Sequence, residues 1–237
     1  MKNTIVECVF DITYESTNAP EGFLSLIASV DSFDNLKKLP LSQIPETIRK
    51  SDPNLRNQPI YEITSSENKE YKVMLGDNTI GLAIVNEYSS WTSSMYPEIE
   101  KLFGKILTSG KIDKINRMGL RYTDFLENEN IFDNGKVKIN IDNNVVADKT
   151  MFVSIEDKIE NISYIKVITN KKQYQYKDGK LSENKGSIVD IVTSLEDQQF
   201  NLKDTNKIFT LIDKLHKIHR EKLKEVVSDE YIIKYGL

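Results

Sequence analysis

A single segment of this 237-residue chain, residues 116–124, constrains the fold more than any other. Its sequence, NRMGLRYTD, alternates apolar with polar or small side chains, a pattern typical of a β-strand with one buried face. An amphipathic stretch precedes it, beginning at Pro97 and stopping at Gly110, residue types at which helices commonly start and end. The apolar face of that stretch consists of Ile99, Leu102, Phe103, Ile106 and Leu107. Together, the two elements predict a helix that lies on a sheet.

Most other strong patterns in the chain are also strand patterns. The expected strands lie at residues 4–12, 60–64, 71–75, 79–85, 116–124, 151–155, 163–169, 173–177 and 187–194. A turn signal at residues 76–78 separates two of them, so an antiparallel meander is expected there. Residues 34–58 contain three prolines and many polar residues, which fits either short helical turns or a long excursion. A second long helix is expected to begin near Asp204 or Thr205.

Both halves of the chain follow one order of elements. Each has a leading strand, an irregular insertion, roughly three antiparallel strands and a closing helix. We therefore predict an α+β fold with antiparallel sheet and helices mainly on one face. A single domain over residues 1–237 is expected, with two pseudo-repeated halves near residues 1–112 and 113–237. Residue identity between the halves is poor, so the repeat lies in the architecture.

Composition argues against several classes of function. A net charge of −4 leaves no electrostatic footprint for nucleic acid or an anionic membrane, so neither is expected as a partner. The single cysteine, Cys8, excludes an intrachain disulfide and a Cys-based zinc cluster, and a small buried hydrophobe is expected there. No apolar run approaches the ~20 residues of a membrane-spanning helix, and the amino terminus lacks a signal-peptide pattern. A cytoplasmic location is therefore expected.

Arg117 and Arg121 are the candidate site residues of the strand at 116–124. At a period of two they share one face of the sheet, and a guanidinium group there needs a partner. Glu7 or Asp11 supplies that partner if the two strands are neighbours, which gives a structural ion pair, the interpretation that we favour. Alternatively, the two arginines form an anion-binding surface, because a planar guanidinium suits bidentate recognition of phosphate or carboxylate.

Two further groups of residues are candidates for recognition. Tyr88, Trp91 and Tyr96 form an aromatic cluster between a strand and a helix, which could stack a nucleobase or a peptide side chain. The ordinary explanation is that these rings pack over the edge of the sheet and cover its hydrophobic core. His216 and His219 share one side of the last helix, where they could ligate a metal with nearby carboxylates or pack along the apolar stripe. Packing is favoured for both groups.

The sequence lacks the common motifs that mark a catalytic site. It contains no glycine-rich phosphate loop, no Gly-x-Ser-x-Gly elbow and no His-Glu-x-x-His motif. We therefore expect no cofactor and no metal site, and favour a protein that is not an enzyme. Acid–base catalysis by Asp or Glu leaves no motif, so catalytic activity stays open.

Three parts of the chain resemble a sporadically distributed family of uncharacterised bacterial proteins, and the order and spacing match across nearly the whole chain. The first part is residues 6–10. The second runs from residue 71 to residue 124 and includes residues 76–77, 88–91, 96–97 and 117–122. The third is the terminal helix with residues 211–216, which ends in residues 228–230 and 235–236. One departure is that Trp91 precedes Tyr96, whereas family members usually place a Tyr-Pro-Gly-Trp-like run directly before the first helix. The family has no established activity to transfer. Its patchy distribution resembles that of genes carried with mobile elements, phage defence or toxin–antitoxin modules.

The resemblance and the missing catalytic motifs favour a non-enzymatic bacterial protein that acts through protein–protein recognition. It is expected to serve as an antitoxin, an adaptor or a sensor in an anti-phage defence or toxin–antitoxin module. A protein partner is expected, and a homo-oligomer fits the same interpretation. The alternative is an enzyme or a nucleotide-binding protein that holds a phosphate-bearing ligand on the face of Arg117 and Arg121.

Overall fold

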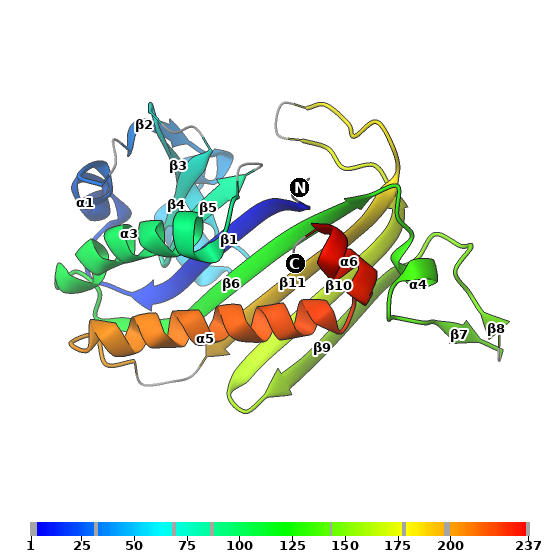
Figure 1. Cartoon of the computed structure of the whole chain (residues 1–237). Helices are drawn as coiled ribbons and strands as arrows, with labels where there is room; N and C mark the ends of the chain where they lie inside the picture. Colours follow the sequence, from blue (N-terminus) through cyan, green and yellow to red (C-terminus); the bar gives the residue numbers. More distant parts are fainter. Residues whose placement is uncertain are drawn as a thin grey trace.

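The computed structural model describes most of the chain. The described residues are 4–30, 33–67, 70–85, 88–142, 144–176, 179–196 and 200–235. They form a nine-stranded antiparallel sheet on which the helices pack (Figure 1). The α+β class and the antiparallel sheet expected from the sequence are therefore confirmed. No helix within these ranges is both long and apolar enough to cross a membrane.

The sheet places the first strand of each half at its centre. Its strands are β1 (Ile5–Glu15), β2 (Phe33–Lys38), β3 (Pro59–Ser65), β4 (Tyr71–Gly76), β5 (Thr79–Val85), β6 (Lys114–Glu127), β9 (Phe152–Ile159), β10 (Ile162–Lys172) and β11 (Gly186–Glu196). They lie in the order β2-β3-β4-β5-β1-β6-β11-β10-β9. Two short strands, β7 (Asn140–Ile141) and β8 (Asn144–Val145), form a separate hairpin. β3, β4 and β5 form the predicted meander.

Two long helices carry most of the helical packing. The α-helices are α1 (Leu24–Ala28), α2 (Glu46–Ser51), α3 (Tyr96–Thr108), α4 (Ile131–Asn134), α5 (Thr205–Lys224) and α6 (Asp229–Tyr235). Shorter helical turns are η1 (Pro20–Phe23), η2 (Pro40–Gln43) and η3 (Trp91–Met95), the last of which leads directly into α3. Asp204 caps α5, because its carboxylate accepts the Lys207 amide at 3.1 Å. Gly110 follows α3 with a φ of 70°, which a glycine adopts without strain.

The helices cover one face of the sheet. Phe10 and Ile12 of β1 are buried in the main core with residues of α3 and α5, and the rings of Phe10 and Phe103 lie 4.8 Å apart. Figure 1 shows α3, α5 and α6 on the same side of the sheet. Strand side chains alternate between faces, so Arg117 and Arg121 of β6 lie on the opposite side.

Both halves of the sheet repeat one strand order. β1 and β6 pair with each other, and each pairs on its outer side with the last strand of its own half, β5 or β11. From there β5-β4-β3 and β11-β10-β9 run outwards as meanders, and α3 or α5 follows its meander along the chain. The repeated order of elements in the sequence thus corresponds to a repeated order in space.

Two segments at or beside the main sheet differ from expectation. Residues 173–176 form no strand, and position 177 lies outside the described residues. Lys171 has a φ of 56° at an irregularity in the β10–β11 pairing, and beyond it Tyr174 stacks on Phe125 with the ring centroids 5.7 Å apart. The Tyr176 amide donates to the Lys180 carbonyl and the Ser182 amide donates to the Tyr174 carbonyl, so the segment pairs as a short hairpin with one bridge and not as a strand of the sheet. β2 was not expected, because five of its six residues are exposed and leave no alternating signal.

Candidate functional site

The two arginines of β6 form ion pairs on the face of the sheet opposite α3 and α5. Arg117 Nη1 donates to Asp11 Oδ2 at 2.5 Å. Arg121 forms a bidentate pair with Asp190 of β11, with Nε 2.9 Å from Oδ1 and Nη2 2.5 Å from Oδ2. The hydrogen bonds that Arg121 donates to the Asp190 carboxylate raise the pKa of Arg121. Glu7 makes no side-chain hydrogen bond or ion pair with the described residues, whereas Glu196 Oε1 lies 3.4 Å from Arg117 Nε. The sequence therefore identified one acid partner, Asp11, and missed Asp190 and Glu196.

Gly119 leaves space for the Arg117 side chain to reach Asp11. Asp11 lies opposite Gly119 in the β1–β6 register, whereas Arg117 lies opposite Thr13. The guanidinium therefore has to cross the position of residue 119. A Cβ atom there would come within 2.4 Å of Arg117 Nη2. The glycine leaves the room that this ion pair needs.

The aromatic residues expected to form a surface are mostly enclosed. Trp91 and Tyr88 are each only 7% exposed, so their ring faces are not open to a base or a peptide side chain. Trp91 stacks on His216 with the ring centroids 4.3 Å apart and the planes at 1°. Its Nε1 donates to Asp213 Oδ1 at 3.1 Å. Tyr96 packs beside Trp91, and the two rings join η3 and α3 to the flank of α5.

A group of polar residues lies beneath α5 on the helix-covered face. The hydroxyl groups of Tyr88 and Tyr122 are 3.2 Å apart, and the Tyr122 ring packs on His219 at a centroid distance of 4.3 Å. Neither ring nitrogen of His219 has a hydrogen-bond partner among the described residues, although the residue is only 2% exposed. Burial lowers the pKa of His219 to about 3, so the imidazole is neutral near pH 7. Such unsatisfied buried groups are uncommon in native proteins.

Asp124 extends this group along β6. It lies two residues after Tyr122 on the same face, is 1% exposed, and accepts the Thr4 hydroxyl at 2.7 Å. Burial raises the pKa of Asp124 to about 6, while the Thr4 hydrogen bond and the charge of Arg220 oppose that shift. Cys8, directly opposite Tyr122 in the register, is fully buried, and burial raises the pKa of its thiol. As expected, Cys8 is a small buried residue.

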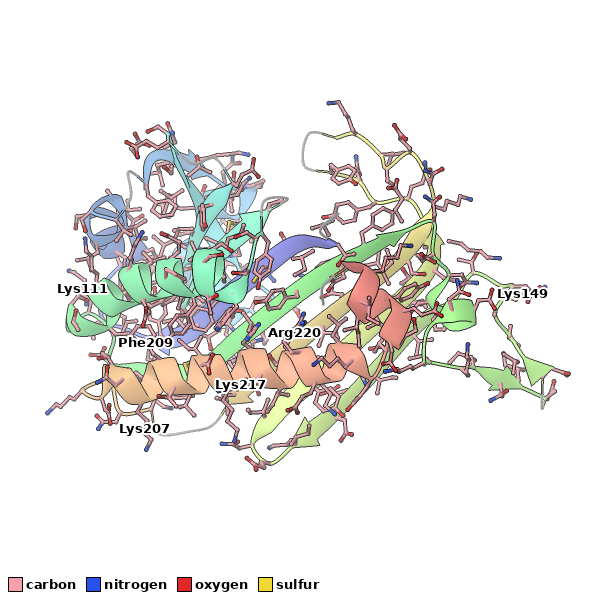
Figure 2. All side chains as sticks on the ribbon, in the orientation of Figure 1. Lys111, Lys149, Lys207, Phe209, Lys217 and Arg220 are labelled. Atoms are coloured by element: carbon pink, nitrogen blue, oxygen red, sulfur yellow. The ribbon has the colours of Figure 1, made fainter. Side chains whose placement is uncertain are left out.

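Arg220 of α5 completes the group. It is partly buried, yet its side chain forms no hydrogen bond or ion pair with any part of the chain that the structure describes. In Figure 2 it extends from α5 over the sheet. Burial is the main influence on the pKa values of Tyr88 and His219, and the charge of Arg220 lowers both. We call Tyr88, Tyr122, Asp124, His219 and Arg220 the Arg220 cluster.

Helical spacing is a signal in the sequence that places Arg220 beside two residues of the aromatic contact. Asp213, His216 and Arg220 follow one another at helical spacing along one flank of α5. The first two contact Trp91, whereas Arg220 lies one turn beyond that contact. Across the described residues, no group of three or more His, Cys, Asp or Glu side chains is placed to hold a metal ion.

The two edges of the sheet differ in regularity. β2 has a register shift between Phe33 and Asn35 and ends in two lysines. β9 pairs with β10 over eight residues without a shift, and its first residue, Phe152, is 70% exposed. One amide of β9 is already used, because Lys158 N–H donates to Asp157 Oδ1 at 2.7 Å. The first half of β9 therefore offers a regular and uncharged edge.

No family model matches the sequence, and no curated protein matches it at a significant level. We therefore infer function from the residues and their geometry.

Proposed function

We propose that this chain is a non-enzymatic binding protein that recognises an extended segment of a partner protein at the β9 edge. The observation that carries the proposal is the regular, uncharged run of residues 152–155 at the end of the sheet. Proteins usually protect such edges with bulges, charges or proline. β2 at the other edge has both a register shift and lysines, so the chain protects one edge and leaves the other open.

A partner segment at β9 would add a tenth strand to the sheet. Backbone hydrogen bonds would supply affinity, and side chains on alternate positions would supply specificity. Phe152 and Ile165 of the neighbouring strand are exposed on one face, and Ile155 is exposed on the other. An uncharged segment with apolar residues on both faces fits these positions best.

The biological setting that we propose follows from the sequence resemblance: an antitoxin, an adaptor or a sensor in an anti-phage defence or toxin–antitoxin module. Binding of a phosphate-bearing ligand between Arg117 and Arg121 has weaker support. Asp11 and Asp190 already occupy the two guanidinium groups, so an anion would have to displace a carboxylate.

Purification from the native host tests the proposal. The tagged wild-type protein is compared with Phe152→Lys/Ser154→Lys, which places two charges on the exposed face of β9. Leu36→Lys on β2, where the leucine is 47% exposed, is the matched control. We expect a stoichiometric partner with the wild type and the control, and loss of that partner with the β9 variant. A chain that stays monomeric by light scattering and retains no partner, or a partner that the β9 variant still holds, would contradict the proposal.

A further inference from the structure

The backbone of β9 faces away from the sheet at every second residue. Met151, the residue before β9, lies opposite Asn170 and accepts its amide at 3.4 Å, so the backbone of Met151 faces β10. Backbone groups in an antiparallel ladder point alternately towards the neighbouring strand and away from it. The register of β9 and β10 has no shift, so this alternation continues along the strand. The outward positions that a tenth strand would use are therefore residues 152, 154 and 156.

Asp157 sets the end of this free edge. Its Oδ1 accepts the Lys158 amide at 2.7 Å, and that amide is the next one along β9 that faces outwards. Its Oδ2 accepts the Tyr164 hydroxyl at 3.0 Å, which holds the carboxylate in place. The strand ends at Ile159, and Glu160 in the turn to β10 has a φ of 54°. A partner strand therefore pairs with residues 152–156 and stops before Lys158.

The side chains of the free edge are uncharged except at its last position. Phe152 is exposed on the face opposite the helices, and Ile155 is exposed on the helix-covered face. Glu156 shares the face of Phe152, and its exposed carboxylate forms no hydrogen bond or ion pair with the described residues. Aromatic pairs and pairs of opposite charge stabilise an antiparallel ladder when they lie directly across from each other. A partner residue opposite Glu156 should therefore be basic, and one opposite Phe152 should be aromatic or aliphatic.

We infer that β9 binds a short antiparallel segment with one basic residue at its amino-terminal end and apolar residues after it. This inference rests on the proposed recognition at the β9 edge and adds the direction, the extent and the charge of the partner segment. The strand pairs that the structure describes in the sheet are antiparallel, and this pairing is slightly more stable than the parallel one. In that direction, the basic residue lies opposite Glu156, and the uncharged part follows along residues 152–155.

A synthetic peptide, Ser-Lys-Val-Thr-Val-Phe-Ser with blocked ends, is a suitable probe for the full chain. In the antiparallel direction it places its lysine opposite Glu156 and its phenylalanine opposite Phe152. The reversed peptide, Ser-Phe-Val-Thr-Val-Lys-Ser, has the same composition and is the matched control. We expect an NMR titration to show that the probe binds at least about fivefold more tightly than the reversed peptide. In the complex, the amides of Ser154 and Glu156 should exchange more slowly, while the Lys158 amide keeps its rate.

A charge exchange tests the role of Glu156. Glu156→Lys should bind the probe more weakly and should prefer a peptide in which glutamate replaces the lysine. Glu46→Lys on α2, which makes the same charge change at an exposed residue, should keep the preference of the wild type.

Several results would overturn the inference: no binding of the probe at millimolar concentration, equal or tighter binding of the reversed peptide, or an unchanged preference in Glu156→Lys. Slower exchange at the Lys158 amide in the complex would also contradict it. The partner isolated from the native host would still be lost in Phe152→Lys/Ser154→Lys if recognition occurs at β9. The two proposals therefore fail separately.

Discussion

Arg121 and Asp190 form a bidentate ion pair between β6 and β11, although they are not directly opposite in the register. Arg121 lies opposite Val192, and Asp190 lies opposite Thr123, so the pair is diagonal. The strand order that puts β11 beside β6 creates this contact. The pair gives Arg121 a charged hydrogen-bond partner, although the sequence alone marks this arginine as a candidate for ligand binding.

The Arg121–Asp190 pair should contribute little to stability. The Arg121 side chain is 45% exposed, and exposed ion pairs contribute about 0–1 kcal/mol. Arg121→Met should therefore lower the free energy of unfolding by about 1 kcal/mol or less. Arg49→Met is the comparison, because the Arg49–Asp77 pair is almost fully buried and its loss should cost about 3–5 kcal/mol. Urea denaturation of both variants measures the difference, and equal losses would show that solvent does not weaken the outer pair.

Gly119→Ala should destabilise the protein through Arg117. The new methyl group would come within 2.4 Å of Arg117 Nη2, and because the guanidinium ends a flexible side chain, it can move aside at a cost of about 1 kcal/mol or less in the weakened Asp11 pair. Arg117→Met/Gly119→Ala should recover part of that loss, because the shorter side chain need not cross the alanine. A double-mutant cycle by chemical denaturation measures the coupling. Strictly additive losses would mean that the glycine serves the backbone and not the arginine.

Asp124 should make the protein less stable as the pH rises. Burial raises its pKa from 3.8 to about 6, so the folded state holds this proton more tightly than the unfolded state. The resulting stabilisation is complete below pH 4 and is lost as the pH passes through 6, a change on the order of 3 kcal/mol. Asp124→Asn should remove that part of the pH dependence. Identical slopes for the variant and the wild type between pH 4 and 7 would disprove it.

His219→Phe should stabilise the protein. It replaces two buried nitrogens that lack partners, and each such group costs about 1–3 kcal/mol. Burial depresses the pKa of His219 to about 3, so the wild type loses stability as the pH falls below the ordinary value of 6.5. The variant should therefore gain at neutral pH and gain more near pH 4. Thermal unfolding of the wild type and the variant at both pH values measures these gains. A variant that is less stable than the wild type at neutral pH would contradict the claim that the His219 imidazole lacks hydrogen-bond partners.

The two long helices and most strands were predictable because each presents a periodic apolar face to the core. α3, α5 and the β3–β5 meander each present a periodic apolar face, and that periodicity is visible without neighbours. β2 presents no such face, since a single residue of it, Phe33, is buried. The segment after β10 was predicted as a strand, but its alternating tyrosines belong to a short hairpin with a single bridge, in which Tyr174 and Tyr176 also contact each other.

Contacts between site residues were predictable only where the order of elements suggested that their strands are neighbours in the sheet. Asp11 could be matched with Arg117, because the leading strands of the two halves were candidate neighbours. Asp190 required the strand order β6–β11, which periodicity does not contain. Arg220 was missed because a polar residue on an amphipathic helix is expected to face solvent.

Hydrogen exchange at the backbone of β9 tests the central claim most directly. The amides of residues 153–156 are compared in the free protein and in the complex with the partner isolated from the native host. Strand addition predicts that the amides among them that do not pair with β10 become strongly protected in the complex, while those of β2 keep their rates. A stable complex in which β9 exchanges as fast as in the free protein would contradict recognition at this edge.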